Sequence, residues 1–304
     1  MESRTKKPPF ARLRANYGCT KMNSRKIRKL AVWSLLLPHL AGVMVFYLLP
    51  FGWGIVQSLR TASGFGLANY AHLFRNEAFR LAAVNTLTLA LVTVPLLVGL
   101  SMAAALYAHR HLKSGFLLLH PVLINFAIPT ASIAYMWTIL FEDFGWVNVW
   151  VHRGFGVPHQ NWLDGALLYV PIVSIFLFKY LAFPIFIFFG GRQSLPAELY
   201  EAASIDGASA FKKFWHLTVP LLTPEILFTA VLGFFYNFKI YKEAYVLFGA
   251  YPPKEAYLIQ HFLNNQFQKV ALDTLTAAAA VMAVAIGAVI YGLIRANRSA
   301  YFPS

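Results

Sequence analysis

Five ionisable side chains interrupt long apolar stretches of the sequence: Lys179, Glu225, Lys239, Lys242 and Glu243. A charge inside a lipid bilayer is costly, so such residues pair with one another, line water or contact a ligand. Lys239 and Glu243 are four residues apart, a spacing that predicts an ion pair along one helix face. Glu225 is close enough to the end of its stretch to reach the interface. Lys242 has no evident partner on its own helix, so we predict that it faces a polar cavity or a subunit interface and not lipid.

Aromatic and amide side chains gather near these charges. Tyr236, Asn237 and Tyr241 lie within about one and a half helical turns, and Asn125 and Tyr135 occupy an earlier apolar stretch. Aromatic faces with a few polar groups are typical of sites that hold sugars. In a chain with 16% aromatic residues, any span displays such side chains, and packing accounts for most of them. Both interpretations stay open from the residues alone.

The sequence lacks the motifs that mark common enzymes. There is no Gly-Lys pair, hence no P-loop to hold ATP phosphates, and there is no HExxH zinc motif or nucleophile elbow. Nine histidines are scattered through loops and the ends of apolar stretches, and Cys19 is the single cysteine. We therefore predict that the chain is not an enzyme and has no metal or cofactor of its own.

A polar segment, Leu195 to Pro224, reads as helix, turn, helix. Ser194 and Pro196 suit a helix start, and Glu198 and Glu201 suit its positive end. Asp206-Gly207 predicts a turn, followed by a second helix from Ala208 to about Leu217. Small residues are dense here, which allows another surface to approach closely. The alternative is a solvated loop whose Phe211, Phe214 and Trp215 rest on the membrane.

The elements that must position these residues are membrane helices. The chain has 304 residues, of which 58% are hydrophobic and 12% charged. Stretches of about 20 apolar residues cross a bilayer, and in lipid they must be helical. Kinks are expected at the prolines within them: Pro38, Pro50, Pro95, Pro121, Pro129, Pro171 and Pro184. Six stretches qualify: Leu30–Ser58, Leu81–Ala108, Phe116–Leu140, Ala166–Phe189, Leu221–Phe248 and Thr274–Ile294. The predicted fold class is all-α, a polytopic membrane protein with six transmembrane helices.

Basic residues indicate the orientation. Arg25, Lys26, Arg28 and Lys29 precede the first apolar stretch, so both termini are predicted to be cytoplasmic. That stretch is too long for a cleaved signal peptide, and Met22 is a second candidate start. The net charge of +14 does not indicate a nucleic-acid partner, because the basic residues flank apolar segments. The expected organisation is a basic tail (1–29), a first helix with an outer loop (30–79) and a core domain (80–304) that contains a cytoplasmic loop (190–220).

The stretch "EAASIDGASAFKKFWHLTVP" resembles the EAA loop of binding-protein-dependent ABC import permeases. Glu201, Ala202, Ala203, Gly207 and Pro220 match that motif, while Leu217 and Val219 stand where the family usually has isoleucine and leucine. The segment from Tyr236 resembles the carbohydrate branch, namely the first permease of the maltose and glycerol-phosphate type. It departs from the branch at "GAYPPKEAY", where relatives often have a glycine-rich outer loop.

The resemblance implies an ABC type I importer permease fold in a bacterial-type cytoplasmic (inner) membrane. It also implies a second permease subunit, an ATPase dimer that carries ATP and Mg, an external solute-binding protein and a saccharide substrate. Membrane lipid would surround the spans. Glu201 would make a charged contact with the ATPase, and Ala202, Ala203 and Gly207 would allow close packing. An ion-coupled secondary transporter remains the alternative, since ionisable residues lie within spans, but it leaves the Glu201 loop unexplained.

Overall fold

The structure is a computed structural model that describes residues 24–61, 64–111, 124 and 128–301, with side chains described between residues 33 and 295. Asn125, Cys19 and Met22 lie outside the described residues, and so do the side chains of the four basic residues before the first span. The chain divides into two compact units, Met1–Val56 and Gln57–Ser304.

The first unit contains α1 (Ser24–Val43), the π-helical turn η2 (Met44–Leu48) and most of α2 (Leu49–Leu59). Leu49 directly precedes Pro50. Its N–H bonds to the C=O of Met44, five residues earlier in the chain. Proline cannot continue the α-helical hydrogen-bond ladder, and the wider π turn accommodates it.

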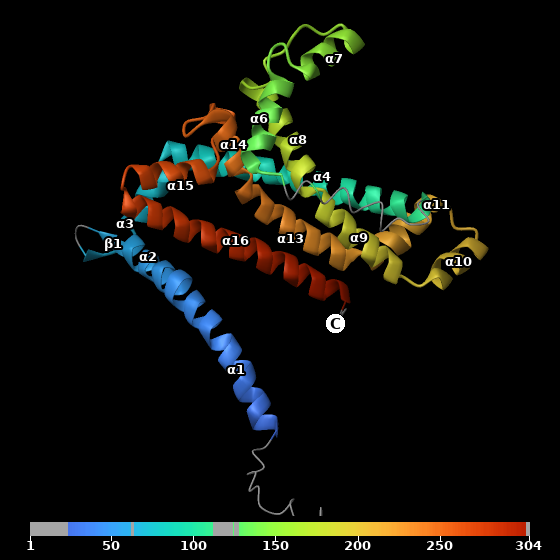
Figure 1. Cartoon of the computed structure of the whole chain (residues 1–304), viewed down its shortest axis with the longest axis horizontal. Helices are drawn as coiled ribbons and strands as arrows, with labels where there is room; N and C mark the ends of the chain where they lie inside the picture. The colour runs from blue at the N-terminus through green and yellow to red at the C-terminus, as the bar shows by residue number, and fades with distance from the viewer. Residues whose placement is uncertain (1–23, 62–63, 112–123, 125–127, 302–304) are drawn as a thin grey trace, which may run out of the picture. The chain divides into compact units, whose positions relative to one another are not determined.

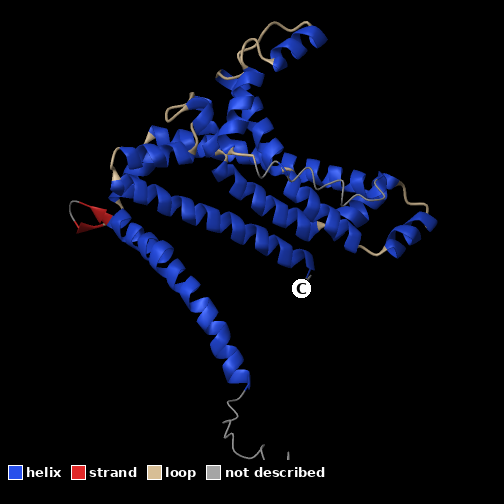
Figure 2. Ribbon diagram, viewed as in Figure 1, coloured by secondary structure: helices blue, strands red, loops and turns tan. Residues whose placement is uncertain are grey.

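The second unit is almost entirely helical, with one short strand pair (Figure 2). The antiparallel strands are β1 (Arg60–Thr61) and β2 (Gly64–Phe65). The helices of the first half are α3 (Ala68–Arg75), α4 (Glu77–His111), α6 (Thr130–Phe141), α7 (Trp146–Phe155), η4 (Gly165–Leu168), α8 (Tyr169–Tyr180) and α9 (Ala182–Ser194). Those of the second half are α10 (Ala197–Ile205), α11 (Ala210–Lys213), η5 (Phe214–Thr218), α12 (Val219–Leu221), α13 (Thr223–Lys239), α14 (Tyr241–Phe248), η6 (Lys254–Ala256), α15 (Ile259–Gln268) and α16 (Leu272–Tyr301).

Among the described residues, three helical segments are long and apolar enough to cross a membrane: Trp33–Leu59, Glu77–His111 and Leu272–Arg295. Two bent pairs raise the number to five, if each pair is one span. They are Gly165–Tyr180 with Ala182–Ser194, bent by 51°, and Ala210–Leu221 with Thr223–Phe248, bent by 68°.

Three of the six predicted stretches are therefore confirmed as helical segments of sufficient length, and two more correspond to the bent pairs if each pair is one span. The remaining one, Phe116–Leu140, falls largely outside the described residues, and α6 forms its end. The bend before Pro184 confirms the kink expected there, because a proline N–H is missing from the ladder. Pro95, by contrast, lies inside the continuous helix α4.

Within the second unit, α4, α9, α13 and α16 lie side by side (Figure 1). The largest apolar cluster joins α4, α6, α8, α13 and α14 around the buried side chains Leu97, Ile133, Ile175 and Phe176. A second cluster around Phe188 and Leu222 ties α4 to α9 and to the start of α13. A third, around Phe79 and Phe262, packs α15 and α16 against the first part of α4. These clusters hold in place the helix ends that carry the candidate site residues.

Candidate functional site

The polar loop folds as the sequence predicts. Helix α10 begins after Pro196 and ends at Ile205, with Asp206 as its C-cap. Gly207 adopts a φ of +73°, a left-handed conformation that glycine adopts without strain. Ser209 caps α11 through a hydrogen bond from the Lys212 N–H. The turn signal at residues 206–207 and the helix on either side of it are therefore confirmed.

The EAA-loop residues are mostly accessible. Glu201, Ala202 and Gly207 are exposed, as is Pro220, and Ala203 is half-buried. None of the residues of α10 is buried. A short helix with a carboxylate and small side chains thus projects from the body of the second unit, where a partner surface could reach it.

One tyrosine joins α10 to the helices before and after it. The Arg192 guanidinium lies 4.0 Å from the centre of the Tyr200 ring. The Tyr200 hydroxyl lies 3.1 Å from the hydroxyl of Thr218, which is buried in η5. A third contact, from Lys213 Nζ to Ser204 Oγ at 3.0 Å, closes the loop between α10 and α11.

Pro220 has a structural consequence of its own. The N–H of Val219 bonds to the C=O of Phe214, five residues back, so the turn before Pro220 is π-helical. The same arrangement precedes Pro50 in the first unit. The proline of the EAA motif therefore rotates the helix that follows the loop relative to a regular α-helix.

Helices α9 and α13 approach closely beside this loop. A Cβ built on Gly191 would lie 2.6 Å from Oε1 of Glu225, so a side chain there would require Glu225 or the helices to shift. Glu225 Oε2 is buried and has no hydrogen-bond partner among the described residues. The sequence suggested that the Glu225 side chain reaches the membrane interface. In the structure it instead packs against the α9 backbone at Gly191.

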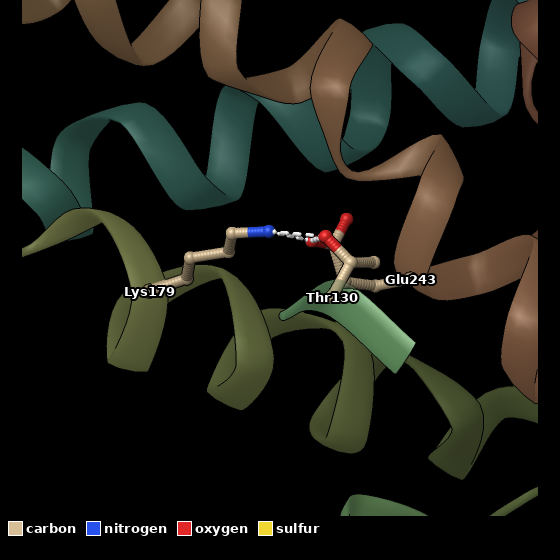
Figure 3. Close-up of polar contacts among 3 residues, drawn as sticks. All are labelled: Thr130, Lys179 and Glu243. Atoms are coloured by element: carbon tan, nitrogen blue, oxygen red, sulfur yellow. Dashed lines mark hydrogen bonds and ion pairs between the residues drawn. The ribbon is translucent and has the colours of Figure 1, made fainter. Parts of the chain in front are cut away.

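A second polar cluster lies where α6, α8 and α14 meet (Figure 3). Lys179 and Glu243 form an ion pair, and Lys179 Nζ also donates to Thr130 Oγ1 at 2.8 Å. The Thr130 hydroxyl donates to Glu243 Oε1 at 3.2 Å. Glu243 is 1% exposed, so its charge is compensated inside the protein and not by water.

The predicted Lys239–Glu243 ion pair is wrong. Glu243 pairs with Lys179 of α8, whereas Lys239 is exposed and lies 5.8 Å from the Tyr236 ring. The regular helix α13 ends at Lys239 and α14 begins at Tyr241, so the two residues do not share one uninterrupted helix. A lysine on a neighbouring helix supplies the partner instead.

The other sugar-site candidates divide by burial. Tyr236 stacks on Tyr180 at 4.2 Å, and Asn237 is buried with hydrogen bonds to Thr93 and to the C=O of Gly233. Both side chains are engaged in packing between helices. Tyr241 is half-buried against His261, and Tyr135 and Lys242 are exposed.

Sequence reasoning missed the roles of Thr130, Arg192, Tyr200 and Thr218. None of these residues belongs to a recognisable motif, and each has its partner far away in the chain or across a loop. The spacing of residues in the sequence therefore does not predict these contacts. Among the described residues there is no group of three or more His, Cys, Asp or Glu side chains that could hold a metal ion.

Residues 98–300 match the family described as "Binding-protein-dependent transport system inner membrane component". The chain belongs to this family. It is a multi-pass protein of the inner membrane that works in binding-protein-dependent transport, and the resemblance drawn from the EAA loop is confirmed.

Several characterised proteins are similar to this chain. "Trehalose/maltose transport system permease protein MalF" of Thermococcus litoralis is 32% identical over 227 residues, covering 72% of this chain and 77% of the relative. "Arabinooligosaccharides transport system permease protein AraP" of Bacillus subtilis is 29% identical and covers 72% of each chain. The Agrobacterium fabrum "sn-glycerol-3-phosphate transport system permease protein UgpA" is 24% identical over 85% of this chain and 91% of the relative.

The fold also matches solved structures. A chain of a bacterial ABC transporter involved in the import of the acidic polysaccharide alginate superposes with a TM-score of 0.75 at 20% identity, covering 90% of this chain and 97% of that one. The same kind of transporter, in complex with an alginate-pentasaccharide-bound periplasmic protein, gives a TM-score of 0.76. At this identity the match shows a shared ABC-permease fold.

Proposed function

We propose that this chain is the first permease subunit of an ATP-driven importer that translocates a saccharide delivered by an external solute-binding protein. The observation that carries the proposal is the exposed EAA-type helix α10, tied on both sides to bent helical spans, in a chain of this family. The names of the similar permeases, for trehalose/maltose and for arabinooligosaccharides, support a saccharide cargo.

The proposed topology has six transmembrane helices with both termini in the cytoplasm. The sixth is the stretch that ends in α6. In this arrangement the tail (1–29), the first helix with its outer loop (30–79) and the core (80–304) are successive parts of one permease, and the loop 190–220 faces the cytoplasm. The near-membrane basic residues before the first span support this orientation.

The proposed assembly contains a second permease and an ATPase dimer, which binds ATP and Mg. Glu201 contacts the ATPase through its exposed carboxylate, while Ala202, Ala203 and Gly207 leave room for the partner surface. Pro220 sets the helix direction after the loop through the π turn before it. Closure of the ATPase dimer would then displace α10 and rock the spans, which is the logic of alternating access.

The proposed cargo path follows the exposed and half-buried polar residues at the junction of α13 and α14. Lys239 and Lys242 form no ion pair with a described residue, and both are exposed in this chain, where they can face the second permease or a water-filled cavity. Because Glu243 is already paired, this junction carries net positive charge. A neutral saccharide is proposed, with an acidic saccharide as the alternative cargo. Tyr135, Asn125 and Tyr241 remain candidates for contact, and contact with Tyr236 and Asn237 would require their packing against Tyr180 and Thr93 to open.

The decisive experiment reverses one charge of α10. In a reconstituted complex, Glu201→Lys is expected to leave insertion unchanged and to abolish ATPase stimulation by the solute-binding protein. Glu198→Lys, one turn earlier on the same exposed helix, is the matched control and should retain most of the stimulation. Normal stimulation and normal uptake of the labelled saccharide in Glu201→Lys would remove Glu201 from the ATPase contact.

The ion-coupled alternative is tested by the energy source. Uptake into proteoliposomes should require enclosed Mg-ATP on the ATPase side and should persist after a protonophore collapses the proton gradient. Uptake that needs the gradient and not ATP would establish the alternative, with the Lys179–Glu243 pair as its first candidate for proton coupling.

A further inference from the structure

Helix α10 is attached to the rest of the protein through half-buried and exposed residues. Not one of its side chains is buried, so apolar packing does not fix its position. The chain enters and leaves it through short connections at Leu195–Pro196 and at Asp206–Ser209. A displacement applied at its exposed surface would be lost in those connections unless a side chain carried it further.

Tyr200 makes two contacts that can carry such a displacement, whereas the contact from Lys213 Nζ to Ser204 Oγ is exposed to water. Its ring stacks under the Arg192 guanidinium in the last turn of α9, at 4.0 Å. Its hydroxyl lies 3.1 Å from Thr218 Oγ1, and either oxygen can donate in this hydrogen bond. One side chain therefore contacts the helix before the loop and the helix after it.

Both of those helices lead to a bend in a span. Residues 182–194 meet the preceding helix at Leu181 with an angle of 51°, and the helix through Thr218 meets α13 at Leu222 with an angle of 68°. We propose that Tyr200 is a positioning residue of the transport cycle, which transmits movement of α10 to these two bent spans. The inference rests on the proposed docking of α10 on the ATPase.

Each contact of Tyr200 leads to a different span: the ring contacts Arg192 of α9, and the hydroxyl contacts Thr218, which precedes α13. Tyr200→Phe removes the hydroxyl and keeps the ring, so it should weaken transmission to α13 and spare transmission to α9. Arg192→Gln removes the cation and should have the opposite effect. Tyr200→Leu removes both contacts. Because Thr218→Val breaks the same hydrogen bond as Tyr200→Phe, the double variant should be no worse than either single variant.

The experiment follows three spin-labelled positions in the complex with its ATPase subunits, in a Cys19→Ser background. Labels replace the exposed Ile205 of α10, Phe228 of α13 and Phe183 of α9, each paired with a reference label at Val284 of α16. Distances are measured before and after trapping with Mg-ATP and vanadate. Matched controls carry Tyr107→Phe, a change of the same kind at an exposed tyrosine of α4 whose hydroxyl has no hydrogen-bond partner among the described residues.

In the unaltered protein all three labels are expected to shift on trapping. Tyr200→Phe should reduce the population of the shifted α13 state about two- to tenfold, the range of one hydrogen bond, with the α10 and α9 shifts retained. Tyr200→Leu should leave only the α10 shift, at unchanged thermal stability and unchanged ATPase association. Tyr107→Phe should behave as the unaltered protein.

Two results would overturn the inference in different ways. If α10 shifts and both spans still follow it in Tyr200→Leu, Tyr200 is not the transmitting residue, and the proposed docking stands. If α10 does not respond to trapping in the unaltered protein, the proposed docking itself fails, and this inference fails with it.

Discussion

At the scale of single residues, the Lys179–Glu243 pair places an ion pair in the protein interior. Glu243 is almost fully buried, and Thr130 satisfies part of the remaining hydrogen bonding. A buried ion pair adds little net stability, because desolvation offsets attraction, but removing one partner leaves an uncompensated charge. The pair fixes the meeting point of α6, α8 and α14 and makes that junction intolerant of single substitutions.

We therefore expect Lys179→Met to lower the free energy of unfolding by about 3–5 kcal/mol, because Glu243 would be left buried and unpaired. The double variant Lys179→Met/Glu243→Leu should recover most of this loss. Thermal unfolding of the detergent-solubilised protein measures both, and Lys242→Met, at an exposed lysine, is the control. Equal stability of Lys179→Met and Lys242→Met would contradict the structural role of the pair.

The buried His261 should make the free energy of unfolding depend on pH. It lies in α15, outside the candidate spans, and is fully buried among Tyr241, Tyr245 and Tyr257. Its Nδ1 accepts the N–H of Leu258, and its Nε2 has no hydrogen-bond partner among the described residues. Burial lowers the pKa of His261 from 6.5 to about 4, so the neutral imidazole is the folded form.

The unfolded chain binds a proton first as the pH falls, so the contribution of His261 is complete above pH 6.5 and is lost progressively toward pH 4. We expect a loss of about 2 kcal/mol between pH 7.5 and pH 5. Unfolding curves at both pH values measure it. His261→Asn keeps an acceptor for the Leu258 N–H but cannot titrate, so its stability should change less between the two conditions; an equal change would assign the pH dependence to other groups.

At the scale of elements, the contact between α9 and α13 is set by the absence of a side chain at Gly191. The Glu225 carboxylate occupies the space where a Cβ would lie. This contact joins α9 to α13 between the two bends. Gly191 lies on the loop side of the bend at Leu181, whereas Glu225 comes three residues after the bend at Leu222.

Gly191→Ala should destabilise the protein by about 1–3 kcal/mol, because the helices must separate or Glu225 must move. Gly190→Ala is the matched control, since nothing lies within 4 Å of a Cβ at that neighbouring position. Adding Glu225→Ala to Gly191→Ala should restore stability. Thermal unfolding decides the matter: a Gly191→Ala protein as stable as the Gly190→Ala protein would show that the helices are not held this closely.

At the scale of the whole molecule, the proposed orientation depends on charges beside the first span. Replacing Arg25, Lys26, Arg28 and Lys29 with neutral residues should invert or mix the topology, whereas deletion of the tail before Met22 should not. Reporter fusions at the C-terminus and in the loop 190–220 measure the orientation. An unchanged orientation after neutralisation would move the topological signal to another part of the chain.

The sequence by itself determined the helices and the turn of the EAA loop. Long apolar stretches must be helical because the bilayer offers the backbone no other hydrogen-bond partners. Asp206-Gly207 specifies the turn because the glycine meets a local conformational need, a positive φ. Pro184 likewise predicted a bend, since the missing N–H acts within one helical turn. These are short-range effects, and spacing along the chain is enough to read them.

Only the tertiary structure decided which side chains meet. The partner of Glu243 is 64 residues away and not four, and Asn237, a candidate for sugar contact, bonds to Thr93 of α4. Tyr200 joins α9 to η5 although nothing in its neighbourhood along the chain marks it. Which residues pair depends on how the helices pack and where they bend. Each side chain at a helix–helix contact lies near several side chains of the neighbouring helices. Local spacing ranks these options poorly, because the low-dielectric interior favours whichever partner the packing brings closest.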